Sequence, residues 1–186
     1  MLQAPVLEAA LPDEVATNLG RLLGRAPVAT LGDWVDAVRQ HTDGEVVAIE
    51  ELCHADEETP HWGVLNGETY HFQCFYDAIV LAAAVAEPVD VRTESPTGEA
   101  ISARAVGSSG VTVDPPSAVF SFGIDSEVDP PGDSGPSNED VYAAVCPWVR
   151  AFPEPSAYRN WADSVPATTV ALPFTEATTI AEALVT

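Results

Sequence analysis

The stretch "WGVLNGETYHFQCFYDAIVLAAAV", residues 62–85, decides the fold predicted for this chain. Two short strand-like runs flank Asn66-Gly67, the dipeptide that best suits the type I′ turn of a β-hairpin. The run that starts at Cys74 is rich in alanine and long apolar residues, which is typical of a buried helix, and Pro88 requires that helix to end. The stretch therefore predicts a hairpin that leads directly into a core helix.

Two helices and an extended segment are predicted before the hairpin. The apolar positions of residues 11–27 recur at helical spacing, which indicates a first amphipathic helix. Thr30 and Asp33 form a capping-box pattern at the start of a second helix, and residues 45–52 favour an extended conformation. Two helices followed by a strand and a hairpin resemble a small winged-helix-like module.

The region after Pro88 is predicted to combine strands with helices. Alternating or clustered apolar residues between Pro/Gly-rich turns predict strands over residues 89–95, 100–106, 110–115, 118–124, 147–153 and 168–173. Helices are predicted from Ser137 to Cys146, over residues 156–164 and over residues 175–185. The fold class is therefore α+β, with a helical winged-helix-like domain over residues 1–65 and a larger domain with a mixed or antiparallel sheet over residues 66–186.

The charge of the chain is strongly acidic. Its formal net charge is -22, from 29 acidic residues and 7 basic residues, and every basic residue is arginine. Such a surface repels phosphate backbones and anionic membranes, so we expect neither nucleic acid nor a membrane as a partner. The absence of lysine resembles proteins of extreme halophiles and favours a halophilic archaeal origin. In molar salt the Debye length falls to about 3 Å, which makes the self-repulsion tolerable.

The termini and the cysteines indicate a reducing compartment. The N-terminal sequence has no basic region followed by an apolar stretch, and the longest apolar run, Ala78–Ala86, is too short to span a bilayer. We therefore expect a soluble, cytoplasmic protein. Three cysteines, Cys53, Cys74 and Cys146, form an odd set, which indicates free thiols or metal ligands rather than a disulfide framework.

The spacing Cys74-x-x-Asp77 is the main candidate for chemistry. Residues three apart on a helix share a face, so the thiol and the carboxylate are expected near one another at the helix start. A helix N-terminus favours a thiolate, which is the nucleophile and the soft-metal ligand, whereas burial beside an anion raises the pKa of an aspartate. Taken alone, the pair also fits a buried structural cysteine with a capping aspartate. Cys146, which lies 72 residues later, fits a core residue equally well unless it reaches the same site.

Two stretches resemble a known family. "GETYHFQCFYDAIVLAAAV" and "EDVYAAVCPWVRAFPEPSAYRNWADS" are similar to the organomercurial lyases, also called alkylmercury lyases, of bacterial and archaeal mercury resistance. The similarity depends on the Cys-x-x-Asp after a hairpin, on Cys146 with Phe152 six residues later, and on Trp161 nine residues beyond that. It is strong over residues 62–164 and weaker elsewhere.

The resemblance implies an activity and a site. It implies that Cys74 and Cys146 are mercury-binding thiols, that Asp77 handles the proton, and that residues 66–186 are the catalytic part. The expected reaction is protonolysis of R-Hg⁺ to R-H and Hg²⁺, and mercury(II) is a soft centre that prefers sulfur ligands. No organic cofactor is implied. Hg²⁺ would leave on small-molecule thiols or on a mercuric reductase.

Alternatives and departures accompany this hypothesis. The same thiols fit a non-catalytic protein that binds or transfers Hg²⁺ or Cu⁺, and the N-terminal helices fit a metal-sensing winged-helix regulator. A zinc site that involves Cys53 and the nearby histidines is disfavoured, because hairpin alternation would place these side chains on two faces. Gln73 stands where members of the family commonly have an aromatic residue, and Pro147 stands where a second cysteine often follows.

Overall fold

A computed structural model describes residues 5–41, 49–107, 109–133 and 135–186 of the chain. The helices are α1 (Asp13–Leu22), α2 (Leu31–His41), α3 (Tyr76–Val85), α4 (Asn138–Val145), α5 (Pro155–Ala162) and α6 (Ala177–Val185), and the 3₁₀ turns are η1 (Val6–Glu8), η2 (Ile49–Glu51), η3 (Cys146–Trp148) and η4 (Phe174–Glu176). The strands are β1 (Trp62–Leu65), β2 (Glu68–His71), β3 (Pro88–Glu94), β4 (Ala100–Val106), β5 (Val111–Asp114), β6 (Val119–Asp125), β7 (Ala151–Phe152) and β8 (Ala167–Pro173). The predicted α+β class is confirmed.

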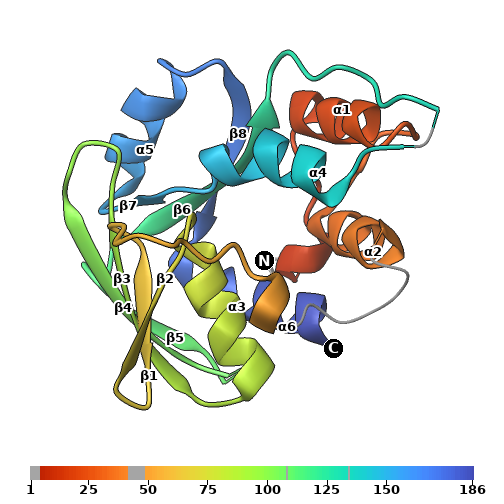
Figure 1. The fold of residues 1–186 in the computed structure, drawn as a ribbon. Helices are drawn as coiled ribbons and strands as arrows, with labels where there is room; N and C mark the ends of the chain where they lie inside the picture. Colours follow the sequence, from red (N-terminus) through yellow and green to blue (C-terminus); the bar gives the residue numbers. More distant parts are fainter. Residues whose placement is uncertain (1–4, 42–48, 108, 134) are drawn as a thin grey trace.

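The strands form two sheets, and both are antiparallel. The first sheet has the order β2-β1-β3-β4-β5 and the second has the order β7-β6-β8 (Figure 1). Every described strand pair is antiparallel, so the prediction that allowed a mixed sheet is wrong in that respect. The predicted hairpin turn is confirmed, because Asn66 and Gly67 have φ values of 52° and 86°, as a type I′ turn requires.

The hairpin does not serve as the wing of an N-terminal module. Residues Trp62–Val64 of β1 pair with β3, so β1 and β2 extend the five-stranded sheet. The physical reason is that a two-stranded ribbon is only marginally stable alone and gains ladder hydrogen bonds by joining a larger sheet. The division of the chain at residue 65 stays a prediction, since one hydrophobic cluster connects the N-terminal helices with both sheets.

Helix α3 is the central element of the core. It packs against β3 and β4 on one side and against α6 on the other, and Ala78, Ile79 and Leu81 are fully buried (Figure 1). Gly63 allows β1 to approach this helix, because a Cβ at that position would lie 2.9 Å from Val89 Cγ1 and 3.1 Å from Ala78 Cβ. The hairpin therefore sets the position of the residues that begin α3.

The N-terminal helices cover the second sheet. Helix α1 contacts β6 and β8, and α2 lies beside α6. The predicted capping box at α2 is confirmed, since the Thr30 N–H donates to Asp33 Oδ2 and the Asp33 N–H donates to Thr30 Oγ1, both at 3.0 Å. Part of the predicted extended segment, residues 45–48, lies outside the described residues. Ile49–Glu51 is a 3₁₀ turn, so that prediction is wrong there.

The region after β6 differs from its prediction in one place. Helix α4 begins with the expected capping box of Ser137 and Asp140, but the strand predicted over residues 147–153 is reduced to β7. Cys146 begins η3 instead, because Pro147 fits the first turn of a helix and offers no N–H to a strand ladder. None of the helices in the described residues has the length and apolar character that a membrane span requires.

Candidate active site

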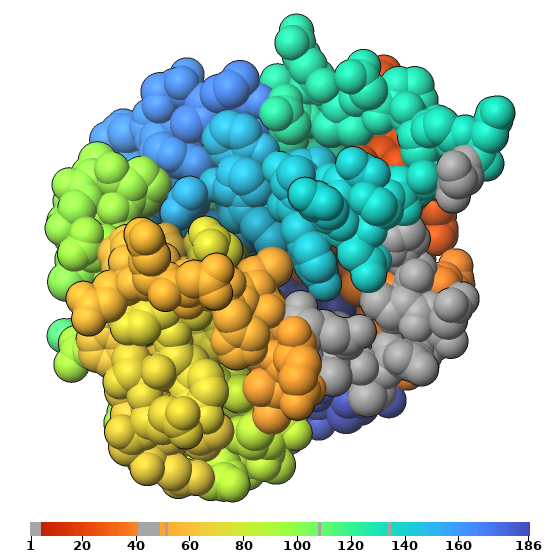
Figure 2. All heavy atoms as spheres, in the orientation of Figure 1, coloured from red at the N-terminus to blue at the C-terminus, as the bar shows by residue number. Residues whose placement is uncertain are grey.

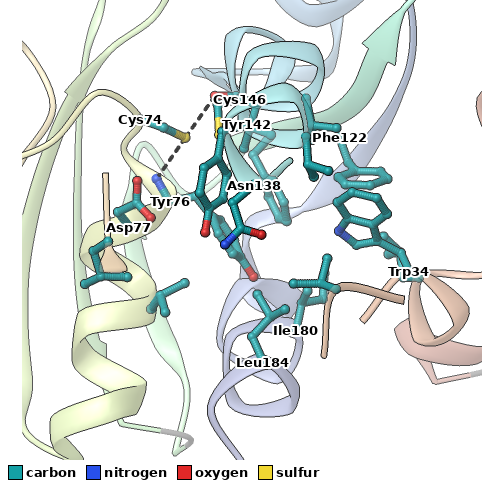
Figure 3. Close-up of a pocket in the computed structure, with 18 of the residues that line it drawn as sticks. Trp34, Cys74, Tyr76, Asp77, Phe122, Asn138, Tyr142, Cys146, Ile180 and Leu184 are labelled. Atoms are coloured by element: carbon teal, nitrogen blue, oxygen red, sulfur yellow. Dashed lines mark hydrogen bonds between the residues drawn. The ribbon is translucent and has the colours of Figure 1, made fainter. Parts of the chain in front are cut away.

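A cavity of about 140 Å³ lies between α2, α3, α4, α6 and β6. Its wall is mostly apolar and includes Trp34, Val80 and Phe122, while Cys74, Asp77 and Cys146 also line it (Figure 3). The structure therefore brings together all three residues that the sequence predicted for the site, although Cys146 lies on a different element from the other two. An apolar wall with a few convergent polar groups is the usual form of a small-molecule site.

Cys74 lies just before α3, two residues ahead of its first helical residue. Its sulfur accepts a hydrogen bond from the Tyr76 N–H at 3.5 Å and donates one to the Val149 carbonyl at 3.6 Å (Figure 3). The residue is only 4% exposed, and burial, followed by the charge of Asp77, raises the pKa of the thiol. Burial therefore outweighs the expected effect of the helix N-terminus, and the resting side chain is a protonated thiol.

Asp77 is the second residue of α3. Burial raises the pKa of its carboxyl group from 3.8 to about 7, and a hydrogen bond from the backbone N–H of Cys53 opposes that rise. A carboxyl group with a pKa near neutrality exists in both protonation states at physiological pH. It is therefore suited to give up and take back a proton during a reaction.

Cys146 is the residue at which α4 gives way to η3. It is half-buried, and its thiol donates a hydrogen bond to the sulfur of Cys53. That bond is the largest cause of a raised pKa at Cys146, followed by burial, whereas the same bond lowers the pKa of Cys53. The two thiols thus have opposite tendencies to ionise.

Cys53 is the neighbour of the candidate site that sequence reasoning missed. In the sequence it stood out only as one of three cysteines and as a member of a disfavoured zinc site. A short bridge between His54 and Phe72 places the segment beside the end of β2, and the Gln73 N–H donates to the Cys53 carbonyl at 2.9 Å. Because Cys74 follows Gln73, this pairing brings a third thiol to the site. The only signal in the sequence was the odd number of cysteines.

Arg150 connects the Cys146 turn to a buried histidine. Its Nε donates to the Pro147 carbonyl at 2.9 Å, and its Nη1 lies 3.1 Å from Nε2 of His61. Burial and the charge of Arg150 lower the pKa of His61 to about 4, and the ring lies 2.6 Å from Thr93 Oγ1 through Nδ1. His61 is therefore neutral and buried.

The described residues hold no ready-made metal centre. No group of three or more His, Cys, Asp or Glu side chains among them is arranged to hold a metal ion. His54 is exposed and its Nε2 lies 2.8 Å from the Ile49 carbonyl, while His61 is engaged by Arg150 and Thr93. The disfavoured zinc hypothesis therefore gains no support from the described residues.

The remaining residues of the sequence pattern pack beside the site. The rings of Phe152 and Trp161 lie 5.0 Å apart between centroids, and Trp148 lies 6.3 Å from Trp161. These contacts fix η3 and β7 against α5. The spacing of Cys146, Phe152 and Trp161 in the sequence therefore corresponds to ring packing that supports the turn carrying Cys146.

Comparison with known proteins identifies the family. The family model of alkylmercury lyases matches residues 54–186, so the chain belongs to the alkylmercury lyase family. No curated protein matches the chain. Among solved structures, the mercury-bound form of MerB2 is similar, with a TM-score of 0.54, 16% sequence identity, and coverage of 94% of this chain and 91% of that chain. At this identity the likeness concerns the fold.

Proposed function

We propose that the protein cleaves the carbon–mercury bond of organomercurials, with Cys74 and Cys146 as mercury ligands and Asp77 as the proton carrier. The observation that carries the proposal is the meeting of two thiols and a carboxyl group of raised pKa in one apolar cavity, in a chain of the alkylmercury lyase family. The two sulfurs supply the soft ligands that mercury(II) prefers.

The reaction proceeds in two proton transfers. Cys146 first takes R-Hg⁺ from the small thiolate that delivered it. The proton of the Cys146 thiol leaves on that departing thiolate, so Cys146 binds mercury as a thiolate. The Cys74 sulfur then bonds to mercury and its proton passes to the Asp77 carboxylate. Asp77 next donates that proton to the carbon, the carbon–mercury bond breaks with its electron pair on carbon, and R-H forms. Hg²⁺ remains on the two sulfurs, and a positioned acid of this kind accelerates a reaction by about 10²- to 10⁴-fold.

The cavity is suited to the organic group. Its volume is about 140 Å³, and Val80, Val141 and Phe122 contribute to an apolar wall next to the thiols. A dry apolar cavity of roughly 150 Å³ holds a benzene molecule in another protein, so a phenyl group fits by volume. Burial of the leaving carbon beside Asp77 also excludes water, which would compete for the proton.

The Hg²⁺ product must leave the protein bound to the sulfur of another thiol. Small cellular thiols, or a mercuric reductase, are the partners we propose for Hg²⁺, because only ligands as soft as the two cysteines displace them. This chemistry requires reduced thiols and therefore a reducing compartment such as the cytoplasm.

A turnover assay tests the proposal. The purified full-length protein is incubated with phenylmercury and excess thiol in high salt, and benzene is measured by gas chromatography. Catalytic release of benzene supports the lyase. Stoichiometric binding without benzene would instead identify a protein that binds or transfers mercury. The winged-helix regulator hypothesis has lost its structural basis, because β1 and β2 belong to the five-stranded sheet.

A further inference from the structure

Cys53 is the thiol that the proposed reaction does not use. Its backbone N–H donates to the Asp77 carboxylate, and its sulfur accepts a hydrogen bond from the Cys146 thiol. It therefore contacts two of the three residues of the proposed mechanism. Cys53 also lies immediately before residues 54–186, the region that the family model matches, whereas Cys74, Asp77 and Cys146 lie inside that region.

The position of Cys53 is fixed by its neighbours. The Cys53 carbonyl accepts from the Gln73 N–H at 2.9 Å, and the Ala55 N–H donates to the His71 carbonyl at 2.9 Å. The ring of His54 packs on Phe72 with 5.2 Å between centroids. These contacts hold the Cys53 segment against the residues that precede Cys74, so its approach to Cys146 is a built feature of the fold.

The three thiols differ in access to solvent. Cys53 and Cys146 are both half-buried, whereas Cys74 is buried. The segment after η2, coloured orange, lies on the molecular surface next to the α4 region, coloured cyan to blue (Figure 2). Cys53 and Cys146 are therefore more accessible to a bulky thiol adduct than Cys74 is.

We propose that Cys53 is a further mercury-binding residue, which takes R-Hg⁺ from the incoming thiol adduct and passes it to Cys146. The inference rests on the proposed function, and it adds an entry step to that function. It requires two sulfurs in contact at each stage.

The transfer is balanced in atoms and charge. In the first step the Cys53 sulfur replaces the thiolate of the adduct on mercury, and the departing thiolate takes up the proton that Cys53 loses. In the second step the Cys146 sulfur bonds to mercury while the bond between Cys53 and mercury breaks. The proton of Cys146 moves to Cys53 along the existing S–H···S contact. Cys53 ends as a thiol, ready for another substrate.

The test compares capture with cleavage in full-length variants. Phenylmercury supplied as its 2-mercaptoethanol adduct is mixed with wild type, Cys53→Ser and His54→Gln, and capture is followed by rapid acid quenching and mass spectrometry of the protein–phenylmercury adduct. Serine keeps the backbone N–H that Asp77 accepts, and His54→Gln perturbs the same segment without removing a thiol. We expect capture by Cys53→Ser to slow by at least about tenfold, which exceeds any change in benzene formation from preloaded enzyme, and we expect normal capture by His54→Gln. Equal capture rates in Cys53→Ser and wild type would overturn the inference.

A second measurement does not depend on turnover or on the folding of Cys53→Ser. Phenylmercury is added to Cys146→Ser, and the modified cysteine is located by peptide mass spectrometry after a short exposure. The inference expects one phenylmercury on Cys53, while modification of Cys74 alone overturns it. Failure of wild type to form benzene would contradict the proposed function, whereas these labelling results would still decide the role of Cys53.

Discussion

Arg150 Nη1 lies 3.1 Å from Nε2 of His61, so the imidazole accepts a hydrogen bond through Nε2. The proton of the neutral ring is therefore on Nδ1, which donates to Thr93 Oγ1 at 2.6 Å. The same guanidinium donates to the Pro147 carbonyl, one residue after Cys146. A buried neutral histidine thus holds the arginine that fixes the turn carrying Cys146.

Replacement of Arg150 by methionine tests this arrangement. Loss of two charge-assisted hydrogen bonds in a half-buried position should lower the free energy of unfolding by about 2–3 kcal/mol, measured by urea denaturation. The pKa of His61 should rise, since one of the two causes that lower it is removed, and an NMR titration reports this change. Arg104→Met is the matched control, because the Arg104–Asp90 pair is exposed and should contribute at most about 1 kcal/mol. Equal losses in the two variants would contradict the prediction.

The pH dependence of stability should reveal the raised pKa of Asp77. Because the pKa of Asp77 is about 7 in the folded state and ordinarily 3.8, the folded state holds the proton more tightly, and stability is lost as pH rises through that interval. Asp77→Asn has no carboxyl group to ionise, so it should not lose stability over this pH interval. The variant should be more stable than wild type above pH 7, by up to about 4 kcal/mol, and the difference in stability should vanish near pH 4.

Asp140 provides a control of opposite sign for that experiment. Hydrogen bonds from Ser137 lower the pKa of Asp140, so its contribution to stability is present at neutral pH and is lost on acidification. Asp140→Asn should therefore be less stable than wild type at pH 7, with the two proteins converging at low pH. A parallel response of the two aspartate variants would mean that the carboxyl group of Asp77 is not perturbed as described.

Active-site substitutions should separate binding from cleavage. Cys74→Ser should abolish benzene release, and Cys146→Ser should reduce it nearly as much, because each removes a proposed mercury ligand. Asp77→Ala should still bind phenylmercury but cleave it about 10²- to 10⁴-fold more slowly, since only the proton transfer is lost. Binding is measured by equilibrium dialysis of mercury and cleavage by gas chromatography. Wild-type turnover in any one of these variants would remove that residue from the mechanism.

The cavity should limit the size of the organic group. Val80→Phe fills part of its 140 Å³ volume, so phenylmercury turnover should fall by at least about tenfold while methylmercury turnover is retained. Val106→Phe adds the same side chain at an exposed position and should change neither activity. The ratio of kcat/KM for the two substrates is the measurement. An unchanged ratio in Val80→Phe would place the organic group outside this cavity.

Salt should stabilise the folded chain. The net charge of -22 causes self-repulsion, which molar salt screens to a range of about 3 Å. The midpoint of thermal unfolding should therefore rise with KCl concentration. A variant with Asp56, Glu57 and Glu58 replaced by their amides should need less salt for the same midpoint, because those three side chains are exposed acids. A midpoint independent of KCl in both proteins would show that the acidic surface does not limit stability.

Local patterns made most of the fold predictable. The Asn66-Gly67 turn, the capping box of Thr30 and Asp33, and the alanine-rich α3 are each encoded by residues that lie close together in the sequence. The proximity of Cys74 and Asp77 at the start of α3 was predictable for the same reason, because they lie three residues apart. These features needed no knowledge of the tertiary structure.

Long-range contacts account for the features of the structure that the sequence did not predict. Cys53 reaches the site because its segment pairs with residues that precede Cys74, and His61 meets Arg150 across 89 residues. No local pattern specifies either pairing. The prediction of the hairpin was likewise confirmed, but the prediction that it forms a wing was wrong. Its partner strand β3 lies beyond α3 in the sequence.

The lining of the cavity has a consequence for how the protein folds. Ile180 and Leu184 of α6 close the wall around the sulfurs of Cys74 and Cys146, which lie 72 residues apart in the sequence. In the proposed function, these two sulfurs bind one mercury ion together only after α6 has docked. A folding intermediate in which α6 has not docked would offer separate thiols, and it would release a captured ion to free thiols more readily than the folded protein does.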